Sequence, residues 1–592
     1  MFFRYLRNLF AINKRLQMEV TKSNFAEKLP CIEKAIEEAD FLAIDGEFTG
    51  LQANNEHKNS PLDTAAERYA KNAHNVNKFL LVQFGLCTFH YDVKKKAFTN
   101  RAFNFYVWPR PYNRSAPDVR FMCQTSSIDF LIQQNFDFNK LFKDGIPYLR
   151  PNDELKIKDM ISERQNLRQT QQTTPNGSTF VVLDKDKEFI EEIYKKVETW
   201  LENPSEQELL LEGYNGFQRR LIYNTVKPKF SSEHCFHMET VVPKDKSERD
   251  RSIKLSKVQA DEQAKLEQER QQKEFDDLNA AVGFSKVIRK ISDSQKLVVG
   301  HNMLLDILYT IQQFVAPLPE DCDEFKEIMK SALPQVIDTK LIASSSPLKE
   351  DIPGTSLEEL HKILEIPKVA SAPEHPGYDQ VDNEKYHEAG YDAYVTGLCL
   401  IGLNNRLAKI AKKDHNNLGL NPELLSPFVN KVNLHRILDI PYLNVAGPDI
   451  QPDRDHVFHI TFPPAWKTTE IIQLFAPFGA VQVSWINDTE AYVSLREYVK
   501  NAKTVIVNTL NNSSFYKVVP YEIHKKVEQQ QSLISATGIT PMLEHAKPFL
   551  VAATPTPENT KKRSASPEPE PFKRSKSVSE DKDKLFGDVS WD

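Results

Sequence analysis

Two acidic side chains, Asp45 and Glu47, stand one residue apart directly after the apolar run 41–44. The run predicts a buried strand, and alternate residues of a strand project from the same face, so both acids would point the same way. Adjacent carboxylates repel each other unless a cation lies between them, and a divalent metal ion is the usual occupant. The alternative is an exposed turn that happens to carry two acids.

Two further acids are predicted to lie near the starts of helices. In the run 300–306 a buried strand breaks at a glycine, which places Asp306 in the first turn of the following helix. His387 precedes Asp392 by five residues, where a long apolar helix begins. On its own, His387 is better explained as a structural residue at a helix start.

These five side chains together favour metal-dependent phosphodiester hydrolysis. Two divalent cations about 3.5 to 4 Å apart need carboxylate oxygens, and together they can hold the attacking and leaving oxygens of a phosphodiester. A histidine with an unperturbed pKa of about 6.5 can take a proton from the attacking water at neutral pH.

Asp45, Glu47, Asp306, Asp392 and His387 resemble the motif set of the DEDD 3′-exonucleases in the branch that carries histidine. A closer resemblance, from about residue 18 to residue 525, is to the poly(A)-specific ribonuclease family of deadenylases. The motifs that carry it are DGEFTGL, QFGLCTF, NFYVWPRPYNR, SSIDFL, FDFNKLFKDGIPYL, GHNMLLDILYT, DTKLIAS and HEAGYDAYVTGLC.

The resemblance implies a homodimer that degrades 3′ poly(A) RNA to 5′-AMP with two Mg²⁺ ions in each active site. It implies that Asp45 bridges the ions, that Glu47 and Asp392 hold the ion on the side of the nucleophile, and that Asp306 anchors the other ion through water. Phe48 and Lys340 would lie near the terminal base and the substrate backbone. Phe48 could equally belong to the core, and Lys340 could equally be a surface lysine.

The family also inserts a small RNA-binding domain with an R-x-x-x-H signature into its nuclease domain. Here Arg219 is followed four residues later by Tyr223, so the histidine is replaced by an aromatic side chain that can stack. Arg219 and Arg220 remain available for phosphate groups of single-stranded RNA. Packing alone is the alternative for this segment.

Residues 456–520 follow the order β-α-β-β-α-β and resemble an RNA-recognition motif. Glu490 falls where the third strand usually carries an aromatic residue, and His459 is predicted to face outward from the first strand. By resemblance, Trp485 would bind the 7-methylguanosine cap, because a cationic purine pairs favourably with an indole face. Packing is the alternative for Trp485, and Trp466 is a lesser candidate.

Composition limits the functions that this chain can have. A formal net charge of −6 argues against binding nucleic acid by bulk positive charge, so RNA contacts must come from local basic surfaces. The six cysteines contain no C-x-x-C pair, which fits neither a disulfide framework nor a zinc site. No apolar run reaches the roughly 20 residues that span a bilayer, so we expect a soluble protein without membrane contact.

The two ends of the chain carry signals for localisation. The segment 1–17 is basic and free of acids, which is typical of a mitochondrial presequence or of an arm added by an upstream start codon. The tail 541–592 is expected to be disordered, and its basic clusters 561–563 and 573–576 are of the kind that importins recognise. We therefore expect the protein to be located in the nucleus and the cytoplasm, and we do not favour targeting to the mitochondrion.

The expected fold is α/β: a ribonuclease-H-like mixed-sheet nuclease domain with an inserted small α/β domain of the R-x-x-x-H type, an α+β RNA-recognition motif and a disordered tail. A catalytically silent RNA-binding adaptor and a 3′ trimmer of small non-coding RNAs are the alternative functions. The expected segments are an N-terminal extension 1–17, the nuclease domain in two halves 18–160 and 281–420, the inserted domain 175–245, a charged helical linker 246–280, the RNA-recognition motif 446–525 and the tail 541–592.

Overall fold

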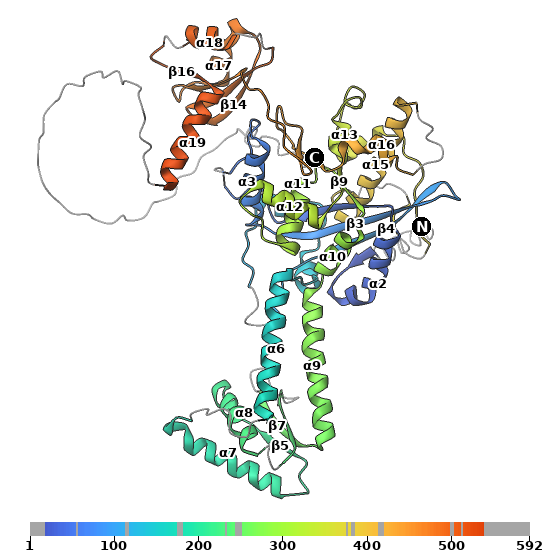
Figure 1. Cartoon of the computed structure of the whole chain (residues 1–592), viewed down its shortest axis with the longest axis vertical. Helices are drawn as coiled ribbons and strands as arrows, with labels where there is room; N and C mark the ends of the chain where they lie inside the picture. The colour runs from blue at the N-terminus through green and yellow to red at the C-terminus, as the bar shows by residue number, and fades with distance from the viewer. Residues whose placement is uncertain are drawn as a thin grey trace, which may run out of the picture. The chain divides into compact units, whose positions relative to one another are not determined.

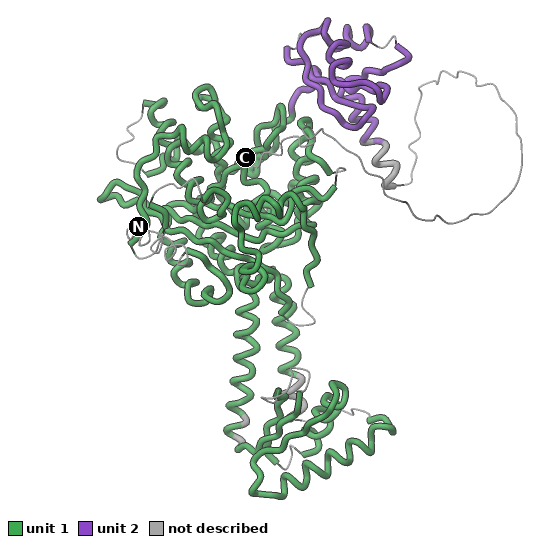
Figure 2. The backbone as a smooth tube through the Cα atoms, turned by 180° about the vertical axis from the view of Figure 1, so that it is seen from behind, with its two compact units in different colours: residues 1–451 green, residues 452–592 purple. Residues whose placement is uncertain are grey.

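The computed structural model forms two compact units, Met1–Gln451 and Pro452–Asp592 (Figure 2). The predicted extension 1–17 and tail 541–592 lie outside the described residues. None of the described helices is both long enough and apolar enough to cross a membrane. The structure describes residues 18–537 except 55–56, 113–117, 174–181, 231–233, 243–250, 374–376, 380–384, 413–418, 498–501 and 511–512.

A seven-stranded mixed sheet forms the centre of the first unit, which confirms the expected fold class (Figure 1). β2 pairs with β3 antiparallel and with β8 parallel, so the strand that carries Asp45 and Glu47 lies inside the sheet. The strands lie in the order β1 (Glu19–Val20), β4 (Ala97–Tyr106), β3 (Leu81–Asp92), β2 (Phe41–Phe48), β8 (Leu297–Gly300) and β9 (Val336–Asp338), and β10 (Ala370–Ser371) pairs with β4.

Helices cover both faces of this sheet because β2 is apolar on both sides. Leu42 and Ile44 belong to one core, and Phe41 and Ala43 belong to the other. The first core is covered by α2 (Lys22–Glu38), α3 (Ala65–Val76), α10 (Ser285–Ser294), α11 (Leu304–Thr310), the π-helix η1 (Ile311–Val315) and α12 (Cys322–Ala332); the second is covered by α13 (Thr339–Ala343), α14 (Leu357–Ile363) and α15 (Ala389–Ile410).

The start of α15 is fixed to the sheet by side chains of two neighbouring strands. Gln83 on β3 accepts the N–H of Ala389 at 3.0 Å, and Asn104 on β4 accepts the N–H of Gly390 at 3.1 Å. The helix also approaches β3 closely at Gly85, where an added Cβ would lie 1.9 Å from the carbonyl oxygen of Ala389. These contacts satisfy helix N–H groups that would otherwise lack partners and set the height of α15 above the sheet.

The nuclease domain is interrupted by an insertion. The helices α6 (Pro151–Thr173) and α9 (Ala260–Val282) run side by side between the main sheet and the insertion (Figures 1 and 2). Beyond them the chain forms a sheet with the strand order β5-β7-β6 and two helices that pack on it. The elements of the insertion are α7 (Asp184–Glu202), β5 (Glu208–Leu211), α8 (Gly216–Phe230), β6 (Phe236–Val241) and β7 (Ser252–Lys257).

Two predicted segment boundaries were wrong. The segment 246–280 is not all helical linker: β7 is the central strand of the inserted sheet, because Ile253 and Leu255 alternate with polar residues and are buried. The second nuclease half does not end at 420. The chain continues through α16 (Pro422–Leu425), η3 (Ser426–Phe428), β11 (Lys431–Asn433) and β12 (Tyr442–Asn444), and the N–H of Asn433 binds Asp338 at 3.1 Å.

The second unit has the predicted β-α-β-β-α-β order and one further helix. Its antiparallel sheet has the strand order β14-β15-β13-β16, so β14 is an edge strand. The additional helix α19 packs on β13 and β16. The elements are β13 (Val457–Thr461), α17 (Thr468–Phe475), η4 (Ala476–Phe478), β14 (Val481–Asn487), β15 (Glu490–Leu495), α18 (Ala502–Leu510), β16 (Lys517–Pro520) and α19 (Tyr521–Thr537).

The contact at Gly85 yields a test of the fold. We expect Gly85→Ala to lower the free energy of unfolding by about 1–3 kcal/mol, because the new methyl group would overlap a backbone oxygen that cannot rotate away. Thermal unfolding of the variant measures this loss. Gly216→Ala is the matched control, since its added Cβ would meet only the end of the Arg219 side chain at 4.0 Å. Equal melting temperatures for both variants would contradict the close approach of α15.

Candidate active site

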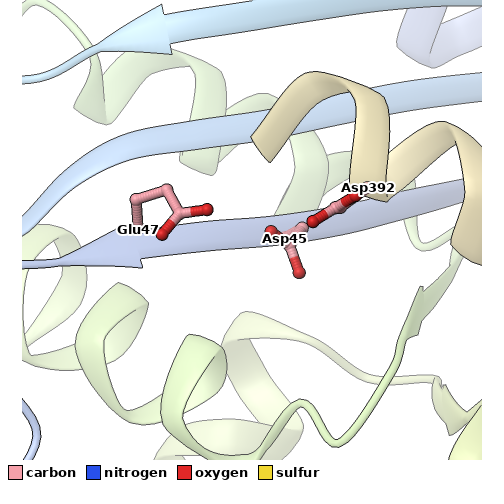
Figure 3. Close-up of side chains that lie close together, drawn as sticks. All are labelled: Asp45, Glu47 and Asp392. Atoms are coloured by element: carbon pink, nitrogen blue, oxygen red, sulfur yellow. The ribbon is translucent and has the colours of Figure 1, made fainter. Parts of the chain in front are cut away.

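β2 and α15 bring three carboxylates together. One oxygen from each of Asp45, Glu47 and Asp392 can be chosen so that all three lie within 4.8 Å of one another (Figure 3). Asp45 and Glu47 follow Phe41 and Ala43 in the strand alternation, so they belong to the face that α15 covers. Asp392 is in the first turn of α15, and the fixed helix start holds it beside the strand.

Asp306 reaches the same strand end from the opposite layer. It lies in the first turn of α11, whose apolar residues belong to the core under the other face of the sheet. A Cβ added to Gly46, between the two acids of β2, would lie only 3.1 Å from Oδ1 of Asp306. The absence of a side chain at position 46 therefore leaves room for the carboxylate of Asp306. Asp306 is not one of the three acids whose oxygens lie within 4.8 Å of one another.

Burial raises the pKa of all four acids. For Asp45 and Glu47, desolvation is the largest cause, and the charges of Asp306 and Asp392 add to it. The pKa of Asp306 is raised to about 7 and that of Asp392 to about 8, again mainly by desolvation, although backbone N–H groups lower both in part. Oδ1 of Asp392 is also buried without a hydrogen-bond partner. A cluster of buried anions with an unsatisfied oxygen fits a divalent cation.

His387 lies immediately before α15 in a left-handed backbone conformation, with φ at 69°. Its backbone N–H donates to Oδ2 of Asp392 at 2.9 Å. The imidazole stands edge-on to the ring of Phe130 on α4 (Thr125–Gln133), with the ring centroids 4.8 Å apart. The predicted proton acceptor is therefore connected directly to one of the acidic residues.

The two predicted contacts to the substrate end are buried. Phe48 is 9% exposed and stacks on Tyr309 with the ring centroids 4.3 Å apart, so the core alternative describes it better. Lys340 is 5% exposed, which excludes the alternative of a surface lysine. Burial and then the charge of Lys340 hold the pKa of His301 at about 3.

The inserted domain presents the two arginines differently. Arg219 donates to the carbonyl oxygens of Tyr214 and Arg251. The side chain of Arg220 is exposed on α8. Tyr223, which replaces the signature histidine, is half-buried and bonds Oγ1 of Thr240 at 3.1 Å. Arg219 and Tyr223 thus connect elements of the insertion, whereas Arg220 faces solvent.

In the second unit, Trp485 lies on the edge strand β14 next to a register shift between positions 485 and 487. The indole is 43% exposed and donates to Oγ1 of Thr468 at 3.2 Å. It meets Phe462 at a right angle with the centroids 5.2 Å apart, and Trp466 stacks on the same phenylalanine. Trp485 therefore combines a fixed orientation with an accessible surface.

The face of this sheet that usually stacks bases is covered. His459 does leave the core side of β13, yet it is only 3% exposed because His524 of α19 stacks on it with a centroid distance of 3.6 Å. The third strand also carries an aromatic residue, Tyr492, opposite His459, and its hydroxyl bonds Nδ1 of His524 at 3.1 Å. His459 thus points away from the core, as predicted, but it is not exposed to solvent, because the unpredicted helix α19 covers it.

Comparison with known proteins agrees with this fold. The profile described as CAF1 family ribonuclease matches residues 20–400, and the profile described as RNA binding domain matches residues 447–527. The chain therefore belongs to the CAF1 ribonuclease family. This is a family of metal-dependent nucleases, and Asp45, Glu47 and Asp392 offer a suitable set of ligands.

Similarity to curated relatives shows to which group within this family the chain belongs. The chain is 45% identical to the poly(A)-specific ribonuclease PARN of Xenopus laevis over 87% of this chain and 83% of that protein. It is 44% identical to the protein of the same name from Homo sapiens over 87% and 82% of the two chains, and 27% identical to the pre-piRNA 3′-exonuclease trimmer of Bombyx mori over 86% and 94%. Within its family, the chain is one of the poly(A)-specific ribonucleases.

Several residues that shape the site were not identified from sequence. Gln83, Gly85 and Asn104 hold the start of α15, and Gly46 makes room for Asp306. Gly46, Gln83 and Gly85 stand in the motifs DGEFTGL and QFGLCTF and Asn104 opens NFYVWPRPYNR, but nothing in the spacing assigns them a partner. The contacts of Gln83 and Asn104 join residues 306 and 286 positions apart, which explains why no local pattern indicates them.

The raised pKa values predict how stability responds to pH and metal. The unfolded pKa of Asp is about 4, below the folded values of about 7 for Asp306 and about 8 for Asp392, so the metal-free native state binds protons more tightly. The resulting stabilisation is present below about pH 4 and is lost as the pH rises through about 7 to 8.

We therefore expect the melting temperature of chelator-treated protein to fall between about pH 5.5 and about pH 8.5. Magnesium should raise it more at the higher pH, because protons compete with the cation for the same oxygens. Differential scanning fluorimetry with and without magnesium measures both effects. A magnesium-induced shift that is the same at the two pH values would contradict this assignment of the carboxylates.

Proposed function

We propose that this chain is a magnesium-dependent 3′-to-5′ exoribonuclease that shortens poly(A) tails of messenger and other RNAs, uses two Mg²⁺ ions and releases 5′-AMP. The observation that carries the proposal is the convergence of Asp45, Glu47 and Asp392 within 4.8 Å, with Asp306 and His387 beside them. A catalytically silent adaptor would have no need for four buried carboxylates that repel one another.

Each residue has a role in the proposed hydrolysis. Asp45, Glu47, Asp306 and Asp392 would hold the magnesium ions, which when bound stabilise negative charge on the phosphodiester oxygens. His387 accepts a proton from the water that attacks the 5′ phosphorus of the terminal adenosine. The bond from that phosphorus to the preceding 3′ oxygen breaks, this oxygen takes a proton from solvent to become the 3′ hydroxyl of the shortened RNA, and 5′-AMP leaves.

The accessory parts support recognition of RNA. Arg220 is exposed on the inserted domain and suits a phosphate contact, whereas Arg219 is engaged within the fold and would act by orienting α8. Lys340 would contribute its positive charge to the region near the bound RNA backbone. Phe48 would support the substrate end from beneath, because its ring is buried against Tyr309.

We further propose that the 5′ cap binds at Trp485 and stimulates deadenylation. The exposed indole offers a face for the cationic 7-methylguanine, and its hydrogen bond to Thr468 fixes the ring before binding. The site lies at the sheet edge, so the covering of the sheet face by α19 does not obstruct it.

A homodimer and a dual location complete the proposal. Apolar side chains that a single chain leaves exposed on and around α4 and α5 (Phe138–Asp144) include Val119, Met122, Ile132 and Phe142, which suits association with a second copy.

We propose that the basic clusters at 561–563 and 573–576 lead the protein to the nucleus as well as the cytoplasm. Mitochondrial targeting by residues 1–17 is not favoured.

A second candidate keeps the chemistry and changes the substrate. The similarity to the pre-piRNA 3′-exonuclease trimmer of Bombyx mori favours trimming of small non-coding RNAs as the alternative. Degradation of 5′-labelled RNAs that end in A, U or C tails separates the two functions. Preference for the A tail supports deadenylation, and equal rates on all three tails support general trimming.

Asp45→Asn tests the enzyme itself. We expect it to abolish shortening of a 5′-labelled oligoadenylate, because a neutral amide at the centre of the acid cluster weakens cation binding. RNA affinity, measured by fluorescence anisotropy, should stay within about threefold, since phosphate contacts lie elsewhere. Asp293→Asn, which changes an exposed acid of α10, is the matched control. Unchanged turnover in Asp45→Asn would refute the proposed site.

Trp485→Ala tests the cap site. Stimulation of deadenylation by a capped 5′ end should disappear, while uncapped tails are degraded at the wild-type rate. Ile486→Ala is the control, because Ile486 is the adjacent residue on β14 and has a similar exposure of 45%. Equal loss on capped and uncapped RNA in Trp485→Ala would show that the tryptophan supports folding or general RNA binding instead.

A further inference from the structure

One aromatic contact in the active site has no part in the proposed function. The ring of Phe130, on α4, meets the imidazole of His387 at an interplanar angle of 76° with the centroids 4.8 Å apart. Edge-to-face pairs of this kind contribute about 0.5–1.5 kcal/mol beyond the area they bury and prefer one mutual orientation. The contact therefore restricts how the imidazole can turn.

The backbone of His387 is held separately from its ring. Its left-handed backbone, with φ at 69°, is unfavourable for a residue with a Cβ and persists only where the surroundings hold it. The hydrogen bond from its N–H to Asp392 fixes the backbone, but a backbone bond leaves rotation about the side-chain torsions free. Phe130 supplies a constraint on the ring itself.

The position of Phe130 depends in turn on β2, the strand that carries Asp45 and Glu47. The side chain of Gln124, at the N-terminus of α4, accepts the backbone N–H groups of Leu51 and Gln52 at 2.9 and 3.1 Å. The backbone N–H of Gln124 donates to the carbonyl oxygen of Thr49 at 2.8 Å. These residues directly follow Glu47 and Phe48 on β2. α4 is thus attached to the end of the strand that carries two of the acids, and Phe130 lies about one and two-thirds turns beyond Gln124 on the same helix.

We infer that Phe130 is a positioning residue that holds the imidazole of His387 in its working orientation relative to Asp45 and Glu47. The inference rests on the proposed role of His387 as proton acceptor. The contact that Phe130 makes in the active site is with the imidazole of His387. Phe130 acts through the histidine. Because α4 is attached to the end of β2, the position of that strand determines where Phe130 contacts His387.

Steady-state kinetics on oligoadenylate with magnesium tests this role. We expect Phe130→Leu, which keeps an apolar side chain of similar size but lacks a planar ring, to lower kcat about tenfold, because a misplaced proton acceptor loses part of its effect. KM should change by less than about twofold, since the substrate contacts remain. RNA affinity measured in an Asp45→Asn background should likewise be unchanged by adding Phe130→Leu.

Phe136→Leu is the matched control for packing. Phe136 belongs to the same aromatic cluster next to α4, and its ring pairs with Tyr106 and Phe138. The same substitution at this site should lower the melting temperature by a similar amount and leave kcat within about twofold of wild type. An equal fall of kcat in both variants would overturn the inference, because it would show a general packing effect.

A double-mutant cycle with His387→Ala separates the inference from the function on which it rests. If Phe130 acts through the imidazole, Phe130→Leu should have no further effect on the residual kcat of His387→Ala. A multiplicative loss in the double variant, or a rise of KM and of the RNA dissociation constant in Phe130→Leu, would overturn the positioning role. Wild-type activity in His387→Ala would instead refute the role of the histidine.

A spectroscopic readout keeps the inference testable if the variants lose stability. In protein labelled at the histidine carbons, the His387 resonance is identified by its absence in His387→Ala. We expect Phe130→Leu to shift this resonance through loss of the aromatic ring current and to leave in place the resonance of His459, which belongs to the other compact unit. An unchanged His387 resonance would show that the two rings do not face each other in solution.

Discussion

Repulsion between buried carboxylates is the constraint on which the catalytic domain depends. Asp45, Glu47, Asp306 and Asp392 come from two strand positions and two helices, and each loses hydration at the place where it meets the others. Such a cluster opposes folding unless protons or cations neutralise it. The large apolar layers on both faces of β2 provide the opposing free energy and hold the acids in place.

Two glycines allow the cluster to form. Gly85 lets α15 approach β3 closely enough to bring Asp392 to the strand, and Gly46 leaves the space that Asp306 occupies from the other layer. A side chain at position 85 would displace α15, and one at position 46 would crowd the carboxylate of Asp306. The arrangement of the four carboxylates therefore depends on two residues that carry no functional group.

The second unit shows a similar separation between fold and site. Its sheet has the strand order of an RNA-recognition motif, but α19 covers the face on which bases usually stack, and His524 occupies the place above His459. An accessible aromatic surface lies at the edge strand, where Trp485 projects next to a register shift. Because an edge indole offers one face, it has room to stack on a single ring.

The sequence by itself determined the elements that depend on local pattern. The apolar run before Asp45, the glycine break before Asp306 and the β-α-β-β-α-β order of residues 456–520 were predicted correctly, because side-chain alternation and helix starts are set by neighbouring residues. The strand β7 was missed, since its charged residues concealed the alternation of Ile253 and Leu255. Only the tertiary structure decided which side chains touch across layers: Gln83 and Asn104 at the start of α15, Phe130 against His387, and α19 over His459. These contacts join residues that are distant in the chain, and their geometry follows from how whole layers pack, a property that no single segment encodes.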